Sequence, residues 1–143
     1  MEKLGKTPPG LQRITNALSY SWQGMVAAYK EEAAFKMEIW ASLIVVPTAF
    51  FLDVTWGERG LMIACVLGVL LCELINSAIE AVVDLASPEI HPLAKRAKDI
   101  GSAVVLLSIL ITASVWGGIL ITRYAQTGQS PQACLDSKQA PGA

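Results

Sequence analysis

Apolar residues in this 143-residue chain are gathered into three long blocks separated by short polar segments. The blocks cover residues 33–53, 61–83 and 100–122, and the third contains no charged side chain. A helix of about 20 apolar residues is long enough to cross the hydrocarbon core of a bilayer. Pro47 lies inside the first block, at a position that a membrane helix tolerates. The pattern therefore predicts three membrane-spanning helices.

A fourth helical pattern, of mixed character, precedes these blocks at residues 11–32. Its apolar positions recur at helical spacing, for example Leu11, Ile14 and Leu18, while polar residues occupy the other face. This pattern predicts an amphipathic helix that lies on the membrane surface. The alternative is an ordinary helix packed on a soluble core, which the three neighbouring blocks disfavour.

The predicted fold class is thus an all-α membrane protein with an N-terminal surface helix and three transmembrane helices. Residues 11–122 form one domain, which suits the length of the chain. We expect residues 1–10, which are rich in Pro and Gly, to be a flexible N-terminus. The polar tail at 123–143 predicts disorder.

The distribution of basic residues predicts the orientation in the membrane. Three spans place the N-terminus and the polar loop 84–99 on the same side. That side carries Lys3, Lys6, Arg13, Lys30, Lys36, Lys95, Arg96 and Lys98, against Arg59, Arg123 and Lys138 on the other. Basic residues favour the cytoplasmic side, so we expect the N-terminus and the 84–99 loop to be cytoplasmic. The net charge is −1, which gives no basic field for nucleic acid.

Neither cysteine nor histidine indicates a metal site or a disulfide framework. Cys65, Cys72 and Cys134 do not form a CxxC pair, and His91 is the single histidine. The thiols are therefore interpreted as inert.

The second block carries the most informative residues. Glu73, Asn76, Glu80 and Asp84 are spaced by 3, 4 and 4 positions. At about 100° per residue they share one helix face, spread along roughly 16 Å. A carboxylate near the centre of a bilayer costs roughly 2.5–3.5 kcal/mol on insertion scales, so such residues are usually retained for function. The alternative is a hydrogen-bond network that only joins helices, although such networks more often use Ser, Thr or Asn.

The surroundings of this stripe suit phosphoryl transfer. Glu31 and Glu32 lie at the same membrane boundary, and the basic segment 95–98 borders Asp84. Carboxylates suit Mg²⁺, which takes substrate phosphates as further ligands, and basic groups suit phosphates. A deeper carboxylate such as Glu73 can accept a proton from a hydroxyl held in lipid. Simpler interpretations are topology anchoring for Lys95 and Arg96, and solvated helix charge for Glu31 and Glu32.

Four stretches of the chain resemble the prokaryotic membrane diacylglycerol kinases. They are RITNALSYSWQG (13–24), EAAFKME (32–38), ELINSAIEAVVD (73–84) and AKRAKDIGSA (94–103). The resemblance implies a homotrimer with sites shared between subunits, in the bacterial inner membrane. It implies ATP- and Mg²⁺-dependent phosphorylation of diacylglycerol to phosphatidic acid, which returns diacylglycerol to phospholipid synthesis.

The resemblance also implies roles for individual residues. Glu73 is the catalytic base, and Glu32 and Glu80 hold the magnesium ion. The implied ATP-binding residues are Tyr20, Glu32, Glu80, Glu89, Ile90, His91, Lys98 and Asp99. The implied lipid-binding residues are Arg13, Ser21, Trp22, Ala34, Phe35, Lys36, Glu38, Glu73, Asn76 and Ser102.

Two alternative functions remain at this point. The loop sequence with Pro92-Leu93 is more similar to the undecaprenol kinases, a sister family, which would place the same chemistry on a polyprenol. A small ion- or proton-conducting oligomer could use the Glu73 and Glu80 stripe as its pathway. That non-enzymatic alternative leaves Glu32, Lys98 and Asp99 without a role.

Overall fold

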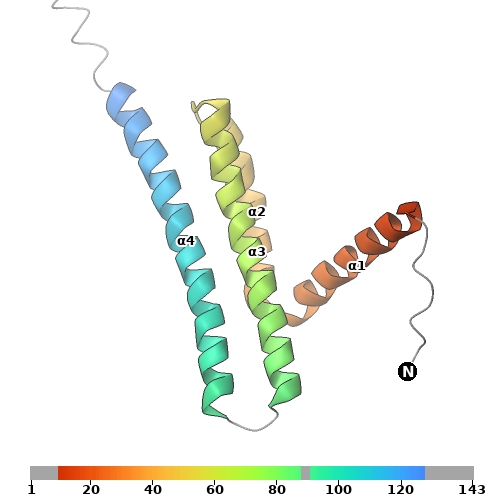
Figure 1. The fold of residues 1–143 in the computed structure, drawn as a ribbon. Helices are drawn as coiled ribbons and strands as arrows, with labels where there is room; N and C mark the ends of the chain where they lie inside the picture. Colours follow the sequence, from red (N-terminus) through yellow and green to blue (C-terminus); the bar gives the residue numbers. More distant parts are fainter. Residues whose placement is uncertain (1–9, 88–90, 128–143) are drawn as a thin grey trace, which may run out of the picture.

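The chain is helical throughout most of the part that is described. The computed structural model describes residues 10–87 and 91–127, and within these ranges it contains four α-helices and no strand. The helices are α1 (Gly10–Glu31), α2 (Ala33–Phe51), α3 (Trp56–Ala86) and α4 (Pro92–Thr127), shown in Figure 1.

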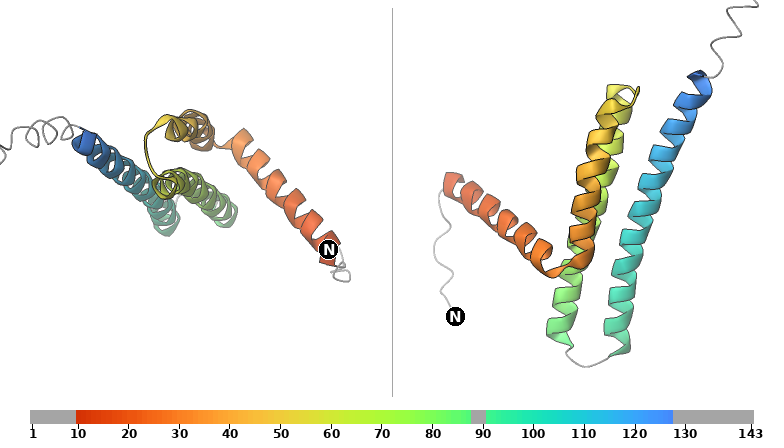
Figure 2. Two further views of the ribbon diagram at one scale, coloured as in Figure 1. Left: turned by 90° about the horizontal axis from the view of Figure 1, so that it is seen from above. Right: turned by 180° about the vertical axis from the view of Figure 1, so that it is seen from behind.

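Helices α2, α3 and α4 lie side by side with alternating direction and form a three-helix bundle (Figures 1 and 2). Helix α3 is central, because it packs against both α2 and α4. Helix α1 projects away from the bundle and contacts it only near its own C-terminal end (Figure 2).

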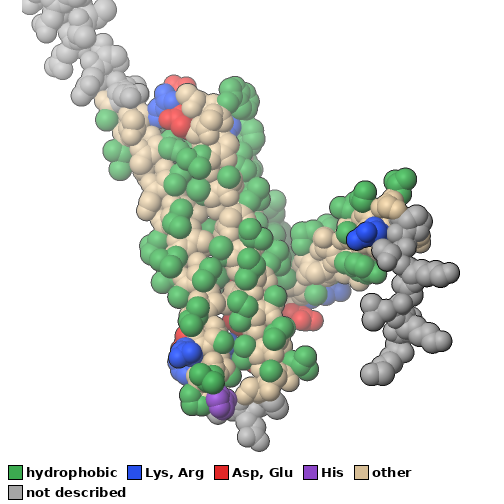
Figure 3. Space-filling view, in the orientation of Figure 1, with side chains coloured by type: hydrophobic (Ala, Val, Ile, Leu, Met, Phe, Trp, Pro, Cys, Tyr) green, Lys and Arg blue, Asp and Glu red, His purple; other side chains and the backbone are tan. Residues whose placement is uncertain are grey.

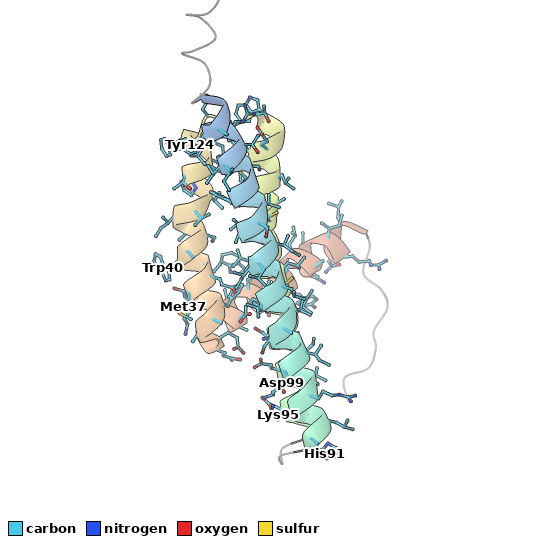
Figure 4. All side chains as sticks on the ribbon, turned by 90° about the vertical axis from the view of Figure 1, so that its left-hand side faces the viewer. Met37, Trp40, His91, Lys95, Asp99 and Tyr124 are labelled. Carbon is cyan, nitrogen blue, oxygen red and sulfur yellow. The ribbon has the colours of Figure 1, made fainter. Side chains whose placement is uncertain are left out.

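The three bundle helices are long and apolar enough to cross a membrane. Their side chains bury little surface within the chain, with a small apolar core of Phe35, Ala49, Met62, Val66 and Val105. Figure 3 shows hydrophobic surface between charged ends of the bundle, and Figure 4 shows Met37 and Trp40 pointing outward from α2. Apolar side chains exposed all along the helices suit a lipid environment, and the predicted fold class is confirmed.

Helix α1 has the amphipathic character that its sequence predicts. None of its residues is buried, and Leu11, Leu18 and Trp22 each keep more than half of their surface exposed. A helix packed on a soluble core would bury this apolar stripe. The soluble-core alternative is therefore wrong, and the exposed stripe suits the membrane interface.

The helices continue beyond the apolar blocks that predicted them. Most of the segment 84–99, expected to be a loop, is helical, because α3 extends to Ala86 and α4 begins at Pro92. Proline is well tolerated in the first turn of a helix, where its missing N–H has no partner to lose. Helix α4 also runs to Thr127, into the tail for which disorder was predicted. Polar residues at these helix ends lie outside the apolar blocks, but their backbone groups keep helical hydrogen bonding.

The turn between α2 and α3 is held by polar contacts. Thr55 and Glu58 form a capping box at the start of α3, which pairs two N–H groups that the helix cannot satisfy. Arg59 donates from Nε to the carbonyl of Ala49 at 2.9 Å and from Nη2 to that of Leu52 at 3.2 Å. Its guanidinium also lies 4.5 Å from the ring centroid of Trp56. These contacts satisfy carbonyl groups at the end of α2, which have no helical partner.

Helices α3 and α4 are joined by side-chain to backbone hydrogen bonds within the bundle. Thr112 Oγ1 donates to the carbonyl of Cys65 at 3.2 Å, and Trp116 Nε1 donates to that of Met62 at 3.1 Å. Arg123 forms an ion pair with Glu58 at the same end as the α2–α3 turn. In a membrane, where water cannot compete, such hydrogen bonds contribute about 0.6 kcal/mol each on average.

We expect Arg59→Ala to lower the free energy of unfolding in detergent by about 2 kcal/mol, because two charged hydrogen bonds to helix-terminal carbonyls are lost. Thermal unfolding followed by circular dichroism measures the loss. Arg96→Ala, at an exposed arginine of α4, is the matched control and should leave the transition in place. Equal melting curves for the two variants would contradict the role assigned to Arg59.

Candidate active site

The chain changes direction between α1 and α2 at a single residue, Glu32. Its backbone is extended, with φ −99° and ψ 116°, while residues on both sides are helical. Glu32 occupies the N-cap position of α2, where an acidic side chain commonly accepts hydrogen bonds from the first turn. Its carboxylate makes no such capping bond. The group is therefore available for another positively charged or donor partner.

The two inner residues of the α3 polar stripe are buried within the chain. Glu73 retains 4% of its exposed surface and Asn76 retains 8%. Asn76 donates from Nδ2 to Glu80 Oε1 at 3.0 Å, which fixes the orientation of both side chains. The spacing of the polar residues predicted one face, and the structure buries the inner part of that face, while Glu80 is half-buried and Asp84 is exposed.

Four glutamates form an acidic cluster. Glu32 lies at the junction of α1 and α2, Glu38 lies on α2, and Glu73 and Glu80 lie on α3. Glu73 lies within electrostatic range of both Glu32 and Glu80, and Glu38 lies within range of Glu73. Glu38 Oε2 is buried without a hydrogen-bond partner in the described structure. Like charges at close range in a weakly polar site repel each other strongly. The cluster therefore favours a bound cation or proton.

Lys98 of α4 supplies positive charge at the mouth of this cluster. Its Nζ lies 2.6 Å from Asp84 Oδ1 on α3, and it also interacts electrostatically with Glu80 and Glu32. The next residue, Asp99, instead pairs with Lys95 on its own helix at 2.6 Å (Figure 4). Adjacent residues thus have different partners, and Lys98 is the one that links α4 to the acidic stripe.

A groove of about 520 Å³ separates α1 from α3. Ser21, Gly24 and Met25 line it from α1, while Leu74, Ser77 and Ala78 line it from α3. Glu32 also borders it, so the groove leads from the apolar surface of α1 to the acidic cluster. A groove with an apolar wall and a polar end suits an amphipathic molecule such as a lipid.

Other residues implicated by the sequence lie outside this cluster within one chain. Phe35 is buried, and Lys36 donates to the carbonyl of Lys30 at 3.0 Å, across the junction of α1 and α2. Glu89 and Ile90 lie outside the described residues. The remaining side chains are exposed along α1, at the start of α2, directly before α4 or on α4: Arg13, Tyr20, Ser21, Trp22, Ala34, His91, Asp99 and Ser102.

Gly101 of α4 is a residue that sequence reasoning missed. A Cβ at this position would overlap the Asn76 side chain, with Asn76 Oδ1 and Cγ as its nearest neighbours. Glycine therefore permits α4 to approach the acidic stripe closely at this level. A small residue in an apolar span is a weak signal of close helix packing, and it does not identify the partner.

The donor set suits magnesium better than zinc. Among the described residues, no three Asp, Glu, His or Cys side chains are placed to hold a metal ion together. Mg²⁺ usually binds through one or two carboxylates and completes its shell with water and substrate phosphates. Glu32 and Glu80, both near Glu73 and Lys98, fit that requirement. A buried carboxylate near two further carboxylates, which are themselves near an ammonium group, fits what deprotonation of a hydroxyl next to a phosphate requires.

The chain was compared with known proteins. The family profile described as "Prokaryotic diacylglycerol kinase" matches residues 19–120. A diacylglycerol kinase of Pseudomonas aeruginosa is 48% identical over 116 residues, which cover 81% of this chain and 94% of that protein. One of Escherichia coli is 48% identical, covering 75% and 88%, and one of Helicobacter pylori is 42% identical, covering 83% and 95%.

We expect Gly101→Ala to destabilise the protein by about 1–3 kcal/mol, because the added methyl group overlaps the Asn76 side chain and must displace the amide that donates to Glu80. Thermal unfolding in detergent measures the effect. Gly118→Ala on the same helix is the matched control, since a Cβ there meets no atom within 4 Å.

A double-mutant cycle tests whether Asn76 is the residue that the added methyl group at position 101 meets. In an Asn76→Ala background the obstructing amide is absent, so Gly101→Ala should become nearly neutral. If Gly101→Ala were equally destabilising with and without the Asn76 side chain, the contact would not be the cause.

Proposed function

The chain belongs to the prokaryotic diacylglycerol kinase family and is a lipid kinase, and on this basis we propose that it transfers the γ-phosphoryl group of ATP to diacylglycerol, with Mg²⁺, at the cytoplasmic face of the membrane. The products are phosphatidic acid and ADP. The observation that carries this proposal is that buried Glu73 lies within electrostatic range of Glu32 and Glu80, both of which are within range of the Lys98 ammonium group.

Glu73 is the proposed general base. Its carboxylate accepts the proton of the lipid hydroxyl as the hydroxyl oxygen forms a bond to the γ-phosphorus. The bond from that phosphorus to the bridging oxygen breaks, and ADP leaves with both bonding electrons. Burial of Glu73 excludes water, which would otherwise compete with the lipid hydroxyl for the phosphoryl group.

Glu32 and Glu80 are the proposed magnesium ligands. The uncapped carboxylate of Glu32 and the oriented carboxylate of Glu80 support this assignment. When bound, Mg²⁺ neutralises phosphate charge and holds the phosphates in line with the attacking hydroxyl. Asn76 holds Glu80 in place through its amide.

Lys98 is the proposed phosphate contact. Its present partner is Asp84, whose side chain is 64% exposed, so a phosphate can replace this carboxylate without burying it. An ammonium group gains more from a doubly charged phosphate than from one carboxylate. The exchange would couple nucleotide binding to release of the link between α3 and α4.

The groove between α1 and α3 is the proposed route for the lipid. Its α1 wall belongs to the helix expected to lie on the membrane surface, and its lining includes Glu32 of the acidic cluster. The basic residues of the N-terminal region and of the 95–98 segment support a cytoplasmic location for this end.

The family also suggests a homotrimer with shared sites. Only 6% of the apolar span of α4 and 11% of that of α2 are buried within one chain. These faces must contact lipid or other copies of the chain. Exposed side chains such as Tyr20, Asp99 and Ser102 could then complete a site across a subunit boundary.

The test is phosphorylation of lipid by the purified protein in mixed micelles with labelled ATP. We expect a phospholipid product from diacylglycerol, dependent on Mg²⁺, and a rate at least about 100-fold lower in Glu73→Gln because the base is lost. Asp53→Asn, at an exposed acid at the opposite end of the bundle, is the matched control.

Two outcomes would redirect the proposal. A strong preference for a long-chain polyprenol would assign the same chemistry to the alternative lipid class. Activity of Glu73→Gln close to wild type would remove Glu73 from the base role.

Magnesium dependence tests the ligands separately. Loss of even an outer-shell partner costs 10- to 100-fold in metal affinity, so Glu80→Ala should raise the half-saturating Mg²⁺ concentration at least about tenfold. Glu73→Gln is the informative comparison, since it should lower the maximal rate without moving that concentration. A Mg²⁺ titration of Glu80→Ala that overlays the wild type, once scaled to its maximum, would exclude Glu80 as a ligand.

A further inference from the structure

Ser77 carries a buried hydroxyl group to which no role has yet been given. Its Oγ is buried and has no hydrogen-bond partner in the described structure. Helical hydroxyls usually bond back to a carbonyl three or four residues earlier. Other residues of the spans do so, including Ser42 to Ile39 and Ser114 to Leu110. A buried hydroxyl without a partner costs about 1–3 kcal/mol, which suggests that Ser77 acts on a bound molecule.

The position of Ser77 on α3 indicates which molecule this is. It lies about 6 Å along the helix from Glu73 and about 4.5 Å from Glu80, between the two. At about 100° per residue, it is turned only about 40° from Glu73 and about 60° from Glu80. It also lines the groove between α1 and α3. Along the axis of α3, Ser77 thus lies between the proposed base and the proposed magnesium ligand, on the side of the helix that faces the groove.

In the proposed reaction the transferring phosphoryl group would occupy that same level of the helix. Its phosphorus would lie between the lipid hydroxyl at Glu73 and the phosphates held near Glu80. Negative charge on its non-bridging oxygens needs hydrogen-bond donors in a site with little water. The Asn76 amide donates to Glu80, and its buried Oδ1 is an acceptor. The hydroxyl of Ser77 is a donor on this face that no protein group uses.

We propose that Ser77 is a further catalytic residue of the phosphoryl transfer proposed above, and that its hydroxyl donates a hydrogen bond to a non-bridging oxygen of the transferring group. The bonds formed and broken remain those already given, since Ser77 neither gains nor loses a proton. Its hydrogen bond stabilises the transition state and not the bound substrates, so its removal should affect turnover more than substrate binding.

The first measurement is the steady-state kinetics of Ser77→Ala. Removing one donor from an oxyanion site costs roughly 10²–10³ in turnover at the upper end, and we expect a fall in kcat of about 10- to 100-fold. The KM values for ATP and lipid should change much less. Ser77→Thr keeps the hydroxyl and should retain most of the activity.

The second measurement separates catalysis from helix packing. ATP with sulfur in place of one γ-oxygen is a poorer hydrogen-bond acceptor at the transferring group. The wild type should therefore lose more rate on changing from ATP to this thio-analogue than Ser77→Ala loses. A purely structural role for Ser77 would lower both rates by the same factor and leave their ratio unchanged.

Ser114→Ala is the matched control, because its hydroxyl bonds to the carbonyl of Leu110 within α4 and should leave both kcat and the thio ratio unchanged. Wild-type turnover by Ser77→Ala, or a thio ratio identical to that of the wild type, would overturn the inference. Neither result would affect the proposed function, which fails only if the wild type itself forms no phosphorylated lipid.

Discussion

Burial of carboxylates among apolar helices is the constraint on which the rest of this structure depends. An ionised carboxylate loses several kcal/mol of hydration in such a site unless a cation or donors replace water. The chain itself supplies few donors or cations to the acidic cluster. Asn76 supplies one amide hydrogen bond, and Lys98 is already paired with Asp84. The protein therefore holds negative charge that a metal ion, a proton or a hydroxyl group of a substrate can compensate. A lipid kinase requires all three.

The fold gathers this charge from segments that are distant along the chain. The break at Glu32 lets α1 leave the bundle while its carboxylate remains at the level of the α3 stripe. Gly101 lets α4 approach Asn76, which in turn orients Glu80. A larger residue at 101 or a continuous α1–α2 helix would displace these groups by more than phosphoryl transfer tolerates. Backbone features without catalytic chemistry thus determine the geometry of the site.

The sequence predicted the spans, the surface helix and the face of α3 that is polar, because each depends on periodicity along one helix. It could not predict which side chains meet across helices. Lys98 and Asp99 are adjacent, yet one pairs with Asp84 on α3 and the other with Lys95 on α4. Gly101 gave only a weak signal of close packing, and Ser77 lay in a stretch that resembles the family, but neither could be assigned a contact, since the role of a small residue depends on what faces it. The lengths of α3 and α4 were underestimated, because apolar blocks report the membrane thickness and not where helical hydrogen bonding ends.

The two ends of the bundle differ in how their charged residues are used. At the α2–α3 turn, Glu58 combines a capping box with an ion pair to Arg123, and Arg59 closes the end of α2. Those charged side chains bond to each other and to backbone groups at helix termini, so they stabilise the fold. At the other end, Asp84 and Lys98 form an ion pair at the surface, whose Lys98 is the proposed phosphate contact. An exposed pair contributes little to stability, at about 0–1 kcal/mol, and breaking it is correspondingly easy. In the proposed mechanism, stability and chemistry fall at opposite ends of the same three helices, so that the site would rearrange around a nucleotide while the bundle remains folded.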